Sequence, residues 1–565
     1  MVVEMKSSEK KRILHIGNIA NNAYQNAKIL NEYGYENIVV SYDYYHIMGC
    51  PEWDDAVIDG TIKNQNFPQW HKVNLNGFNR PDWFVAAPLK LCVEYIEAYC
   101  KGDKLRAFFL KKKERKVREK ISDVECDGKS INNKDIIEKV YFIIRWCVLG
   151  VAHVIRKIVR CLTRVVKYFV LKFVGIMCRF FHELIGIYCR LLRKYDGNKV
   201  MNFIYTFSKK TFDKLVKENK KNINKNNNDI REQVENDFKE LFPDRTCIFG
   251  DSLDNYIQVA KIMKPILGYF NEIIGYATNP VFLYLSGCKD YIAYEHGTLR
   301  DLPYEDSDMG RLMLIAYAKS KAIYCTNVDC YESAQYITQK TKIPIICGLH
   351  GIDIDALIGK IDEAKNWKES NLNWITQLSG PVFFCPARHS WDPSRNCYIK
   401  GENKFIEAAT RISGQGYDFT IIMVEWGDNT EDIRKMIDNA SNLCKHIKWI
   451  QPLSKKELYY LYNQSDAVLD QFILKAYGAI TFEVLASGRP VLISAGADEK
   501  LEKAFFGDNV LHYSCYEADE IYDAMMEVIN KTDRYRWYSQ NGRSWIKEHH
   551  SKECIYNALM RAIEA

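Results

Sequence analysis

The sequence predicts an α/β fold with two Rossmann-like domains, each a doubly wound parallel sheet. The chain has 565 residues, which is more than a single hydrophobic core accommodates. Apolar strand-like segments alternate with helical segments in two series of similar size, one before and one after about residue 360. Such alternation is typical of βαβ units, and therefore of parallel sheets covered by helices on both faces.

Composition excludes several classes of protein. Hydrophobic residues make up 47% of the chain and charged residues 27%, which is a globular balance. The net charge of +6 is small for this length and does not indicate a nucleic-acid partner. The 18 cysteines are scattered without a C-x-x-C pair, which favours reduced thiols. The charged N-terminus is unlike a secretory signal, so we expect a cytoplasmic protein.

The first series begins with a strand at 12–17, a helix that ends near Gly34, and a second strand from residue 36. Only Gly17 follows the first strand, so the G-x-G-x-x-G fingerprint is absent and NAD is disfavoured. Further strand-like segments of the first series lie at 246–251, 289–296, 321–327 and 343–351. The second series has strand-like segments at 381–388, 419–427, 446–453, 467–472 and 490–494.

These segments divide the chain into domains. We expect a first Rossmann-like domain in two parts, 1–103 and 236–360, separated by an insertion at 104–235. A second domain follows at 361–545, and a closing helix at 546–565 is expected to pack back across both. Ligands of such folds bind outside the carboxyl ends of the strands, which places a site in the cleft between two facing sheets.

The insertion has an unusual composition. Its run at 141–194 is apolar, with basic residues that recur at mostly multiples of three or four and fall on one helical stripe. A basic amphipathic helix of this kind suits an anionic membrane surface. The alternative is a helical hairpin whose apolar faces bury against each other or against a partner chain. A spanning helix is disfavoured because Lys167, Lys172 and Arg179 interrupt every candidate window.

The strongest motif lies at 474–494, LKAYGAITFEVLASGRPVLIS, which reads as a loop, a helix and a strand. The helix begins near Tyr477, Gly478 and Ala479, where free backbone N–H groups and the positive end of the helix dipole can hold a diphosphate. Glu483 lies about one turn inside this helix, where its carboxylate can accept hydrogen bonds from ribose hydroxyls.

This motif resembles the retaining GT-B glycosyltransferases of the glycosyltransferase-4 type, also called glycosyl transferases group 1. Their pattern is close to E-x-F-G-x-x-x-x-E-A-x-A-x-G-x-P-V, and the matching residues are Tyr477, Gly478, Glu483, Ala486, Gly488, Pro490 and Val491. The resemblance covers about 1–100 and 246–565 and implies the GT-B architecture.

The sequence departs from the family at the family's first glutamate, which falls on Lys475. That glutamate usually contacts the donor sugar. Asp470 and Gln471 resemble a subgroup that reads D-Q-x-x-x-G-x-Y-G and can take over part of its role. A cation at Lys475 would suit a donor sugar with a carboxylate, such as a uronic acid; the alternative is a side chain that points to solvent or phosphate.

The resemblance assigns further residues. Arg388, after the strand VFFCPA, and Lys400, in a Lys–Gly pair, are expected to hold the donor diphosphate; the loop between them is longer than usual. Two fixed cations stabilise the charge that develops on a leaving diphosphate. His296, which follows the strand YIAYE, is expected near the donor sugar or the reacting centre, with Glu295 and Asp301 as neighbours.

Loops at other strand ends complete the expected donor site. Gly17 and Asn18 resemble the loop that approaches the diphosphate from the first domain. Glu425 and Gln451 end two strands of the second domain and could line the nucleotide pocket.

No cofactor or metal is expected. The D-x-D string at 353–355 resembles the metal-binding string of GT-A enzymes, but it opens a helix, and acids in a first turn have an ordinary dipole explanation.

The sequence therefore predicts a glycosyltransferase that moves a sugar from a nucleotide-diphosphate sugar to a hydroxyl acceptor with retention. If the basic run binds membrane at its inner face, the acceptor is expected to be lipid-linked or a growing polysaccharide. The alternative is an inactive GT-B relative that acts as a membrane-associated scaffold. No sequence signal supports an epimerase or a phosphorylase of the same architecture.

Overall fold

The computed structural model describes residues 11–58, 62, 64–126, 227–367, 371–392, 397–440, 442–496 and 498–565. The described residues up to Asp123 and from Arg231 onward belong to one compact unit, which contains both sheets. The described ends of the other unit, at 124–126 and 227–230, are helical. The basic run predicted to bind membrane, at 141–194, lies outside the described residues.

The first half of the compact unit contains a parallel sheet. Within the described residues this sheet has seven strands, in the order β3 (Phe84–Ala86), β2 (Glu36–Ser41), β1 (Arg12–Ile16), β4 (Glu272–Tyr276), β5 (Ile292–Tyr294), β6 (Ala322–Cys325) and β7 (Ile345–Cys347). All of its pairs are parallel, so the carboxyl ends of the strands lie along one edge.

The helices of this half follow the strands in chain order. They are α1 (Asn22–Glu32), α2 (Pro51–Asp55), α3 (Leu89–Cys100), α4 (Lys104–Cys126), α7 (Ser252–Leu267), α8 (Pro280–Leu285), α9 (Asp308–Ala318) and α10 (Tyr331–Thr338). Short 3₁₀ turns lie between them: η1 (Ile19–Asn21), η2 (Ile47–Gly49), η3 (Trp70–Lys72), η4 (Leu302–Tyr304) and η5 (Val328–Cys330).

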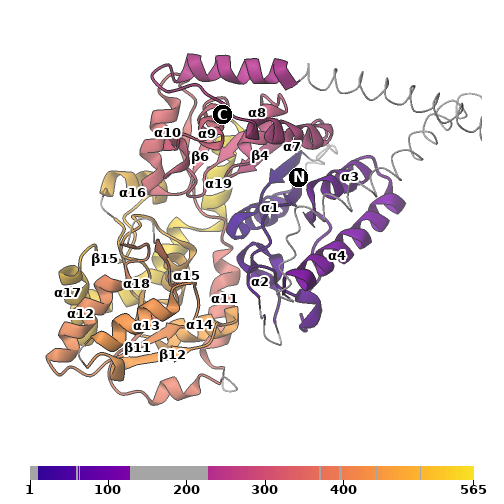
Figure 1. The fold of residues 1–565 in the computed structure, drawn as a ribbon. Helices are drawn as coiled ribbons and strands as arrows, with labels where there is room; N and C mark the ends of the chain where they lie inside the picture. Colours follow the sequence, from indigo (N-terminus) through magenta and orange to yellow (C-terminus); the bar gives the residue numbers. More distant parts are fainter. Residues whose placement is uncertain are drawn as a thin grey trace, which may run out of the picture. The chain divides into compact units, whose positions relative to one another are not determined.

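The second half contains another parallel sheet, drawn mostly in orange and yellow in Figure 1. Its six strands within the described residues lie in the order β12 (Ile447–Ile450), β11 (Thr420–Val424), β8 (Val382–Cys385), β13 (Ala467–Leu469), β14 (Val491–Ile493) and β15 (Tyr513–Ser514). Its helices and 3₁₀ turns are α11 (Ile354–Lys365), η6 (Asn373–Gln377), α12 (Glu402–Gly414), α13 (Thr430–Asn439), η7 (Cys444–His446), α14 (Lys455–Gln464), α15 (Ala479–Ser487), α16 (Glu499–Phe506), α17 (Ala518–Ile529), α18 (Asp533–His549) and α19 (Lys552–Ile563).

The predicted fold class, two doubly wound parallel sheets, is therefore confirmed. One predicted strand is wrong, because residues 246–250 form an irregular loop. The N–H of Gly250 donates to the Asp308 carboxylate at 2.9 Å, and Arg311 donates to the Ile248 carbonyl at 2.7 Å. Because side chains of α9 form hydrogen bonds with these backbone groups, the segment does not pair with a sheet.

Three strands and one hairpin were not anticipated. The strands are β3, β4 and β15, which are short or contain Gly275 and lack a clear alternation. The hairpin pairs β9 (Trp391–Asp392) with β10 (Cys397–Tyr398) and lies in the long loop between Arg388 and Lys400. Within the described ranges, no helix combines the length and the apolar composition that crossing a membrane requires.

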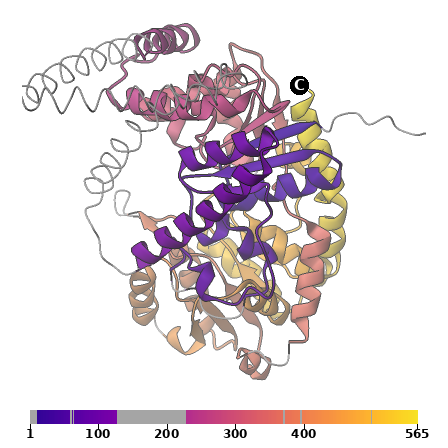
Figure 2. The ribbon, with the colours of Figure 1, turned by 90° about the vertical axis from the view of Figure 1, so that its right-hand side faces the viewer.

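The C-terminal end of the chain connects the halves. Helix α18 packs on α15 of the second half, whereas α19 packs on α1, β6 and β7 of the first. Figures 1 and 2 show α19, in yellow, beside the elements of the first half. The Lys321 ammonium group donates to the Ile563 carbonyl at 2.7 Å and fixes the end of α19. The last helix therefore ties the second half to the first sheet.

A histidine lies in the core of the first sheet. His15 on β1 is 0% exposed, and its two ring nitrogens bond to the Tyr276 hydroxyl and the Asn37 amide oxygen, each at 2.9 Å. Burial lowers the pKa of His15 from 6.5 to about 4, although the bond to Asn37 opposes the shift. The ring is therefore neutral at neutral pH.

This burial predicts a loss of stability in acid. The unfolded chain binds a proton at His15 at higher pH than the folded chain does, so acidification from about pH 6.5 to about pH 4 favours unfolding. In His15→Gln, the free energy of unfolding should depend on pH less steeply in this window, by about one proton. Thermal midpoints measured across the window for both proteins test this, and parallel curves would contradict it.

Candidate active site

The N-terminus of α15 is the centre of the candidate site. The chain leaves β13 at Leu469, crosses the sheet edge and enters α15 at Ala479, with Gly478 as the extended residue before the helix. No side chain caps this helix end among the described residues, so its first N–H groups are available to a ligand. Seven residues of α15, including Glu483, are buried.

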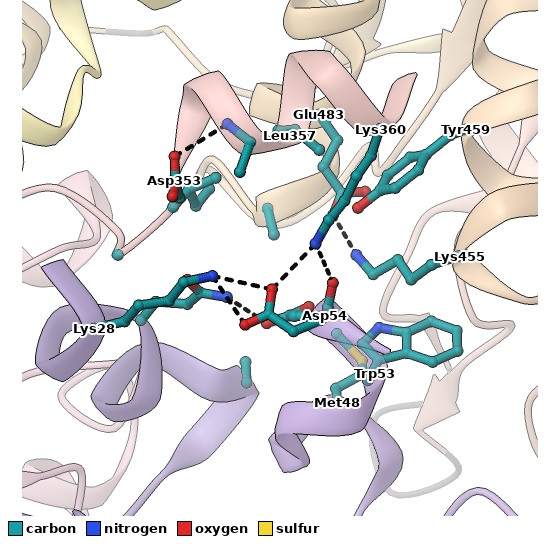
Figure 3. A pocket seen from close by; sticks show the side chains of 17 residues that line it. Lys28, Met48, Trp53, Asp54, Asp353, Leu357, Lys360, Lys455, Tyr459 and Glu483 are labelled. Carbon is teal, nitrogen blue, oxygen red and sulfur yellow. Dashed lines mark hydrogen bonds and ion pairs between the residues drawn. The ribbon is translucent and has the colours of Figure 1, made fainter. Parts of the chain in front are cut away.

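A small cavity lies between this helix end and the first half of the molecule (Figure 3). Its volume is about 90 Å³. Both halves line it, with Ala20, Gln25, Lys28, Met48, Trp53, Asp54, Asp55, Gly351, Ile352, Asp353, Ala356, Leu357, Lys360, Lys455, Tyr459, Ala479 and Glu483. The predicted position of the site, between the carboxyl ends of two sheets, therefore contains a cavity.

Glu483 is held by two partners at the wall of this cavity. Its carboxylate accepts a hydrogen bond from the Lys455 ammonium group, with which it forms an ion pair, and another from the Tyr462 hydroxyl at 3.1 Å. Burial alone would lower the pKa of Lys455, but the Glu483 charge raises it above its ordinary value. Lys455 is therefore charged and neutralises a carboxylate that is only 6% exposed.

Sequence reasoning missed Lys455. It begins α14 directly after the strand 447–450 and the loop that contains Gln451, so its place at a strand's carboxyl end was a usable signal. Its ammonium group lies 5.6 Å from the ring centroids of both Trp53 and Tyr459. Trp53 belongs to α2, so this cation also contacts the first half.

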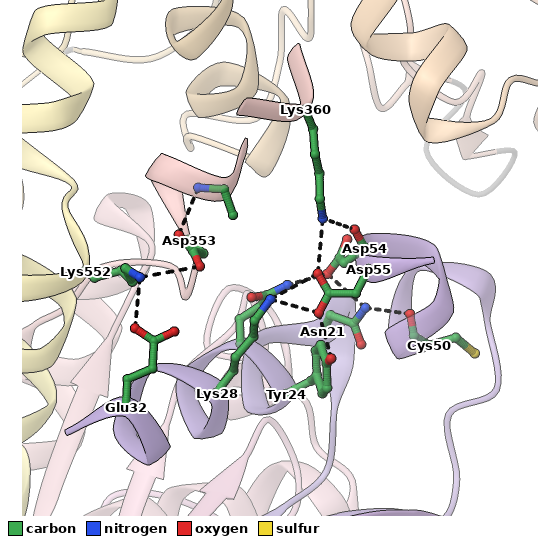
Figure 4. A network of polar contacts seen from close by, with 12 residues as sticks. Asn21, Tyr24, Lys28, Glu32, Cys50, Asp54, Asp55, Asp353, Lys360 and Lys552 are labelled. Carbon is green, nitrogen blue, oxygen red and sulfur yellow. Dashed lines mark hydrogen bonds and ion pairs between the residues drawn. The ribbon is translucent and has the colours of Figure 1, made fainter. Parts of the chain in front are cut away.

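A second polar network crosses the same cavity (Figure 4). Lys28 donates to the Asp55 carboxylate at 2.9 Å, and Lys360 on α11 donates to it at 3.1 Å. These cations, despite burial of the group, lower the pKa of Asp55. Gln25 donates to Asp54 at 2.8 Å. Since α11 packs on α14 and α15, Lys360 links the first half to the elements that hold Glu483.

The D-x-D string opens α11. The Asp353 carboxylate accepts a hydrogen bond from the Ala356 N–H at 3.1 Å, which makes it the N-cap, and it lies 3.7 Å from the Lys552 ammonium group. Asp355 is exposed in the first turn. Within the part of the chain that the structure describes, no three metal-ligating side chains come together. The string therefore serves as a helix cap here.

The two cations expected at the diphosphate lie on the second half. Arg388 follows β8 with an exposed side chain, and it acts electrostatically on Tyr44 and His46 of the first half. The Lys400 ammonium group donates to the Gln471 amide oxygen at 2.6 Å, and its carbonyl accepts from the Phe472 N–H. Both cations therefore lie on loops after strands, with Lys400 bound to the Asp–Gln pair.

The residues between β13 and α15 differ in their surroundings. Asp470 is buried, and desolvation raises the pKa of its carboxyl group although Lys400 opposes this. Gln471 donates to the Ala476 carbonyl at 2.8 Å and fixes the turn. Lys475 is exposed, with its ammonium group 5.8 Å from the centroid of the Tyr516 ring.

Tyr477 points into the core of the second half. Its hydroxyl donates to the Glu502 carboxylate and lies 3.4 Å from the His512 Nε2 atom. The side chain is 3% exposed, so it supports the loop from inside. Of this residue, only the backbone faces the start of α15.

His296 lies at the carboxyl end of β5, beside the cleft. Its Nδ1 atom is 3.3 Å from the Asn22 side-chain amide, and its ring packs edge to face on His350 at 5.6 Å. Desolvation, with smaller effects from His350 and Arg300, lowers the pKa of His296 well below its ordinary value, so the ring is neutral. Glu295 is 0% exposed and accepts from the backbone N–H groups of the loop after β6, which holds the His296 loop in place.

The loop after β1 is fixed by its own side chains. Gly17 has a φ of +90°, and a Cβ there would lie 2.4 Å from the Asn279 amide nitrogen. Asn18 is 0% exposed; its amide oxygen accepts from the Tyr24 N–H at 3.0 Å and its amide nitrogen donates to the Gly49 carbonyl. Asn18 therefore shapes the loop, and backbone atoms remain to face the cleft.

The strand-end pair Glu425 and Gln451 lies together at the edge of the second sheet. Gln451 donates to the Glu425 carboxylate at 2.6 Å, and Arg434 forms an ion pair with the same carboxylate. Neither residue lines the cavity that contains Glu483. The structure thus groups Ala479 with Glu483, and Lys400 with Gln471, but leaves Glu425 and Gln451 as a separate pair.

The ion pair at the cavity predicts a large effect of Lys455→Met. Removing one partner of a buried pair leaves an uncompensated charge, so the free energy of unfolding should fall by about 3 kcal/mol. Lys456→Met is the matched control, because Lys456 is 40% exposed and lies 3.9 Å from an exposed Glu363 and 4.7 Å from the centroid of the Trp367 ring. It should cost under about 1 kcal/mol. Urea unfolding of both variants tests this, and equal costs would refute a buried pair at Glu483.

Comparisons with known proteins agree with the motif. Residues 395–545 match the family model of glycosyl transferases group 1. No curated protein matches the chain.

Three solved structures are similar to it in part. HepE of Anabaena in complex with UDP is 15% identical over 56% of this chain and 84% of that chain, with a TM-score of 0.43. A glycosyltransferase of Rickettsia africae is 14% identical over 57% and 83%, with a TM-score of 0.40. A UDP-forming α,α-trehalose-phosphate synthase of Burkholderia xenovorans is 14% identical over 56% and 80%, with a TM-score of 0.43.

The family match covers the segment that holds Lys400, Lys455, the start of α15 and Glu483. Residues 395–545 are therefore similar to the glycosyl transferases group 1 family, in agreement with the motif at 474–494.

Proposed function

We propose that the protein transfers a sugar from a nucleotide-diphosphate sugar to a hydroxyl acceptor and retains the anomeric configuration. The observation that carries this proposal is the uncapped start of α15, which lies beside Glu483 at a cavity between two parallel sheets. The surrounding segment, 395–545, matches the family model of glycosyl transferases group 1, which supports the proposal.

The second half is proposed to bind the nucleotide. The diphosphate lies at the N-terminus of α15, where the first N–H groups and the helix dipole favour an anion. Arg388 and Lys400 add two cations from neighbouring strand ends. The Glu483 carboxylate has about four acceptor positions, of which Lys455 and Tyr462 occupy two, so the others remain for ribose hydroxyls.

Donor binding requires the halves to part. The cavity of about 90 Å³ is far smaller than the roughly 300–1,000 Å³ of ligand pockets. Opening would break the contacts from Lys360 to Asp55 and from Lys455 to Trp53, together with others such as the ring contact of Tyr331 with Phe505. Closure after binding would expel water and bring His296 against the sugar.

The proposed chemical step is a group transfer. The bond between the anomeric carbon and the diphosphate oxygen breaks, and a bond from the acceptor oxygen to the same face of that carbon forms. The acceptor proton passes to the leaving diphosphate, whose charge Arg388, Lys400 and the α15 N-terminus stabilise. His296 contributes as a neutral hydrogen-bonding group, because its depressed pKa keeps the ring uncharged.

The place of Lys475 supports a surface role over contact with a donor carboxylate. Its side chain is exposed and lies over Tyr516 of the same half. A donor panel tests this, and a uronic acid donor that outperforms neutral hexoses would restore the carboxylate alternative.

An inactive scaffold is the alternative function. It predicts that no nucleotide binds to the protein, whereas the transferase predicts that one nucleotide class does. The combination of Arg388, Lys400, Glu483 and His296 favours the transferase.

Nucleotide binding is the direct test of the proposal. Among UDP, GDP and ADP without added metal, one should raise the thermal midpoint, because a ligand at 100 times its Kd adds about 2.7 kcal/mol to the folded state. Glu483→Gln should abolish most of this shift, and Glu431→Gln, whose carboxylate is 80% exposed on α13, should keep it.

Two outcomes would contradict the proposal. If none of the nucleotides shifts the thermal midpoint, the result supports the inactive scaffold and contradicts the transferase. If the matching nucleotide sugar is turned over to a product of inverted configuration, as read by NMR of the anomeric proton, retention is wrong.

We further propose that residues 141–194 hold the protein on the inner face of an anionic membrane. The sequence supports this through its basic stripe and apolar background. Full-length protein should float with phosphatidylglycerol vesicles at low salt and be released at about 1 M salt, where the Debye length falls to about 3 Å. The triple variant Arg156→Glu, Arg160→Glu and Arg164→Glu should lose flotation; salt-independent flotation of that variant would refute the electrostatic contribution.

A further inference from the structure

A groove on the first half of the molecule lies apart from the cavity that contains Glu483, with no lining residue in common. It has a volume of about 870 Å³ and lies between α4, the end of α3 and the segment 68–82. Figure 1 shows α3 and α4 side by side in this region. Aromatic and basic side chains share its wall. We propose that this groove binds the acceptor, and that the acceptor is an amphiphile with a phosphate group; this inference rests on the proposed transferase function.

The floor of the groove contains more positive than negative charge. Arg80 forms an ion pair with Glu52 at 2.6 Å, and Arg118 forms one with Glu114 at 2.8 Å. Lys111 donates to the Phe84 carbonyl, a neutral acceptor, at 2.6 Å. Over the whole lining, six cations (Arg80, Lys104, Lys111, Lys112, Arg115 and Arg118) face four carboxylates (Glu52, Asp82, Glu114 and Glu119). The Glu52 and Glu114 side chains are nearly inaccessible, at 3% and 2% exposure. An uncompensated cation in such surroundings favours an anionic ligand.

The electrostatics of Arg118 support this surplus. Desolvation and the neighbouring Arg80 lower the pKa of Arg118, although Glu114 opposes both. Arg118 is 18% exposed and Arg80 only 6%, so Arg118 is the arginine of the pair that a ligand reaches. A phosphate there would relieve the repulsion between the two arginines and could bind a guanidinium group in two-pronged geometry.

One wall of the groove is apolar. Phe78 and Trp70 line it from the 68–82 segment, and Phe108 lines it from α4. Phe108 is 63% exposed although it lies beside the groove. An exposed phenyl ring next to a cation cluster suits a ligand that has both an apolar part and an anionic part. This combination favours an amphiphile over a free sugar.

The groove leads toward the donor site. A smaller hollow shares Trp70, Arg80 and Arg118 with it and continues to Tyr44 and Gly49 at the carboxyl end of β2. Burial raises the pKa of the Tyr44 phenol, while Arg388 of the second half acts in the opposite sense. Tyr44 thus lines the hollow and lies within electrostatic range of Arg388, a cation of the proposed diphosphate site. The hollow has a volume of about 20 Å³, so an acceptor anchored at Arg118 would widen it to bring a hydroxyl toward the donor sugar.

Two neighbouring pairs on α4 provide matched controls. Phe108 and Phe109 are similarly exposed, at 63% and 60%, but only Phe108 lines the groove. Lys112 and Lys113 are both exposed, and only Lys112 lines it. Substitutions within a pair therefore change the same chemistry on and off the groove.

The probe is n-decyl phosphate, with inorganic phosphate and decanol as separate arms, titrated into the full-length protein by calorimetry. Decyl phosphate should bind, and each fragment should bind at least about tenfold more weakly, because each lacks one of the two contacts. Phe108→Ser should weaken decyl phosphate binding about tenfold. Arg118→Gln should weaken it by a similar factor, and Lys112→Gln by about threefold. Phe109→Ser and Lys113→Gln should change it less than about twofold.

Several results would overturn the inference. These are no binding of decyl phosphate, equal losses within either matched pair, or inorganic phosphate that binds as tightly as decyl phosphate. The last result would mean a general anion site only. If Arg118→Gln fails to fold, the Phe108 and Phe109 variants still decide the question.

Nucleotide binding is measured in the same samples. If a nucleotide binds and decyl phosphate does not, the acceptor groove is wrong and the proposed transferase stands. If decyl phosphate binds in the groove and no nucleotide binds, the transferase is wrong and the groove is an amphiphile site without a role as an acceptor site.

Discussion

The ion pair between Glu483 and Lys455 is the constraint on which the arrangement of the site depends. Glu483 lies inside a buried helix, where a carboxylate requires a partner charge. That requirement fixes the start of α14 against α15, since Lys455 opens the first and Glu483 belongs to the second. The Lys455 charge also faces Trp53 of the first half. One pair of charges thus links two helices of the second half to α2.

Charge also joins the halves at the opposite wall of the cavity. The Asp55 carboxylate on α2 accepts hydrogen bonds from Lys28 of its own half and from Lys360 of α11. Helix α11 is the segment by which the chain passes from the first sheet to the second, and Asp353 caps its start. The rings of Tyr331 and Phe505 and of His350 and Phe482 also join the halves, but the contacts of Asp55 at the cavity wall are polar. Such contacts exchange readily with water and ligand, which suits a cleft that opens for its donor.

The two halves contribute different groups to the proposed reaction. The second half contributes cations and a helix N-terminus to the donor, while the first contributes neutral His296 and the hollow that leads to Arg118. Loops at the carboxyl ends of the strands carry most of these groups. Parallel pairing explains this convergence, because it brings strand ends that are distant in the sequence to one edge.

Local patterns in the sequence were enough to predict most of the helices and strands. Apolar runs predicted most strands, and the motif around Gly478 and Glu483 predicted the loop and helix that the structure contains. The sequence did not predict that residues 246–250 form a loop and no strand. Asp308 and Arg311, which lie about 60 residues further along the chain, form hydrogen bonds with the backbone of this segment. Tertiary packing brings Lys455 to Glu483 and to Trp53, and it assembles the cation cluster at Arg118. Each of these contacts joins residues far apart in the sequence, and the spacing of residues along a chain does not encode such a distance.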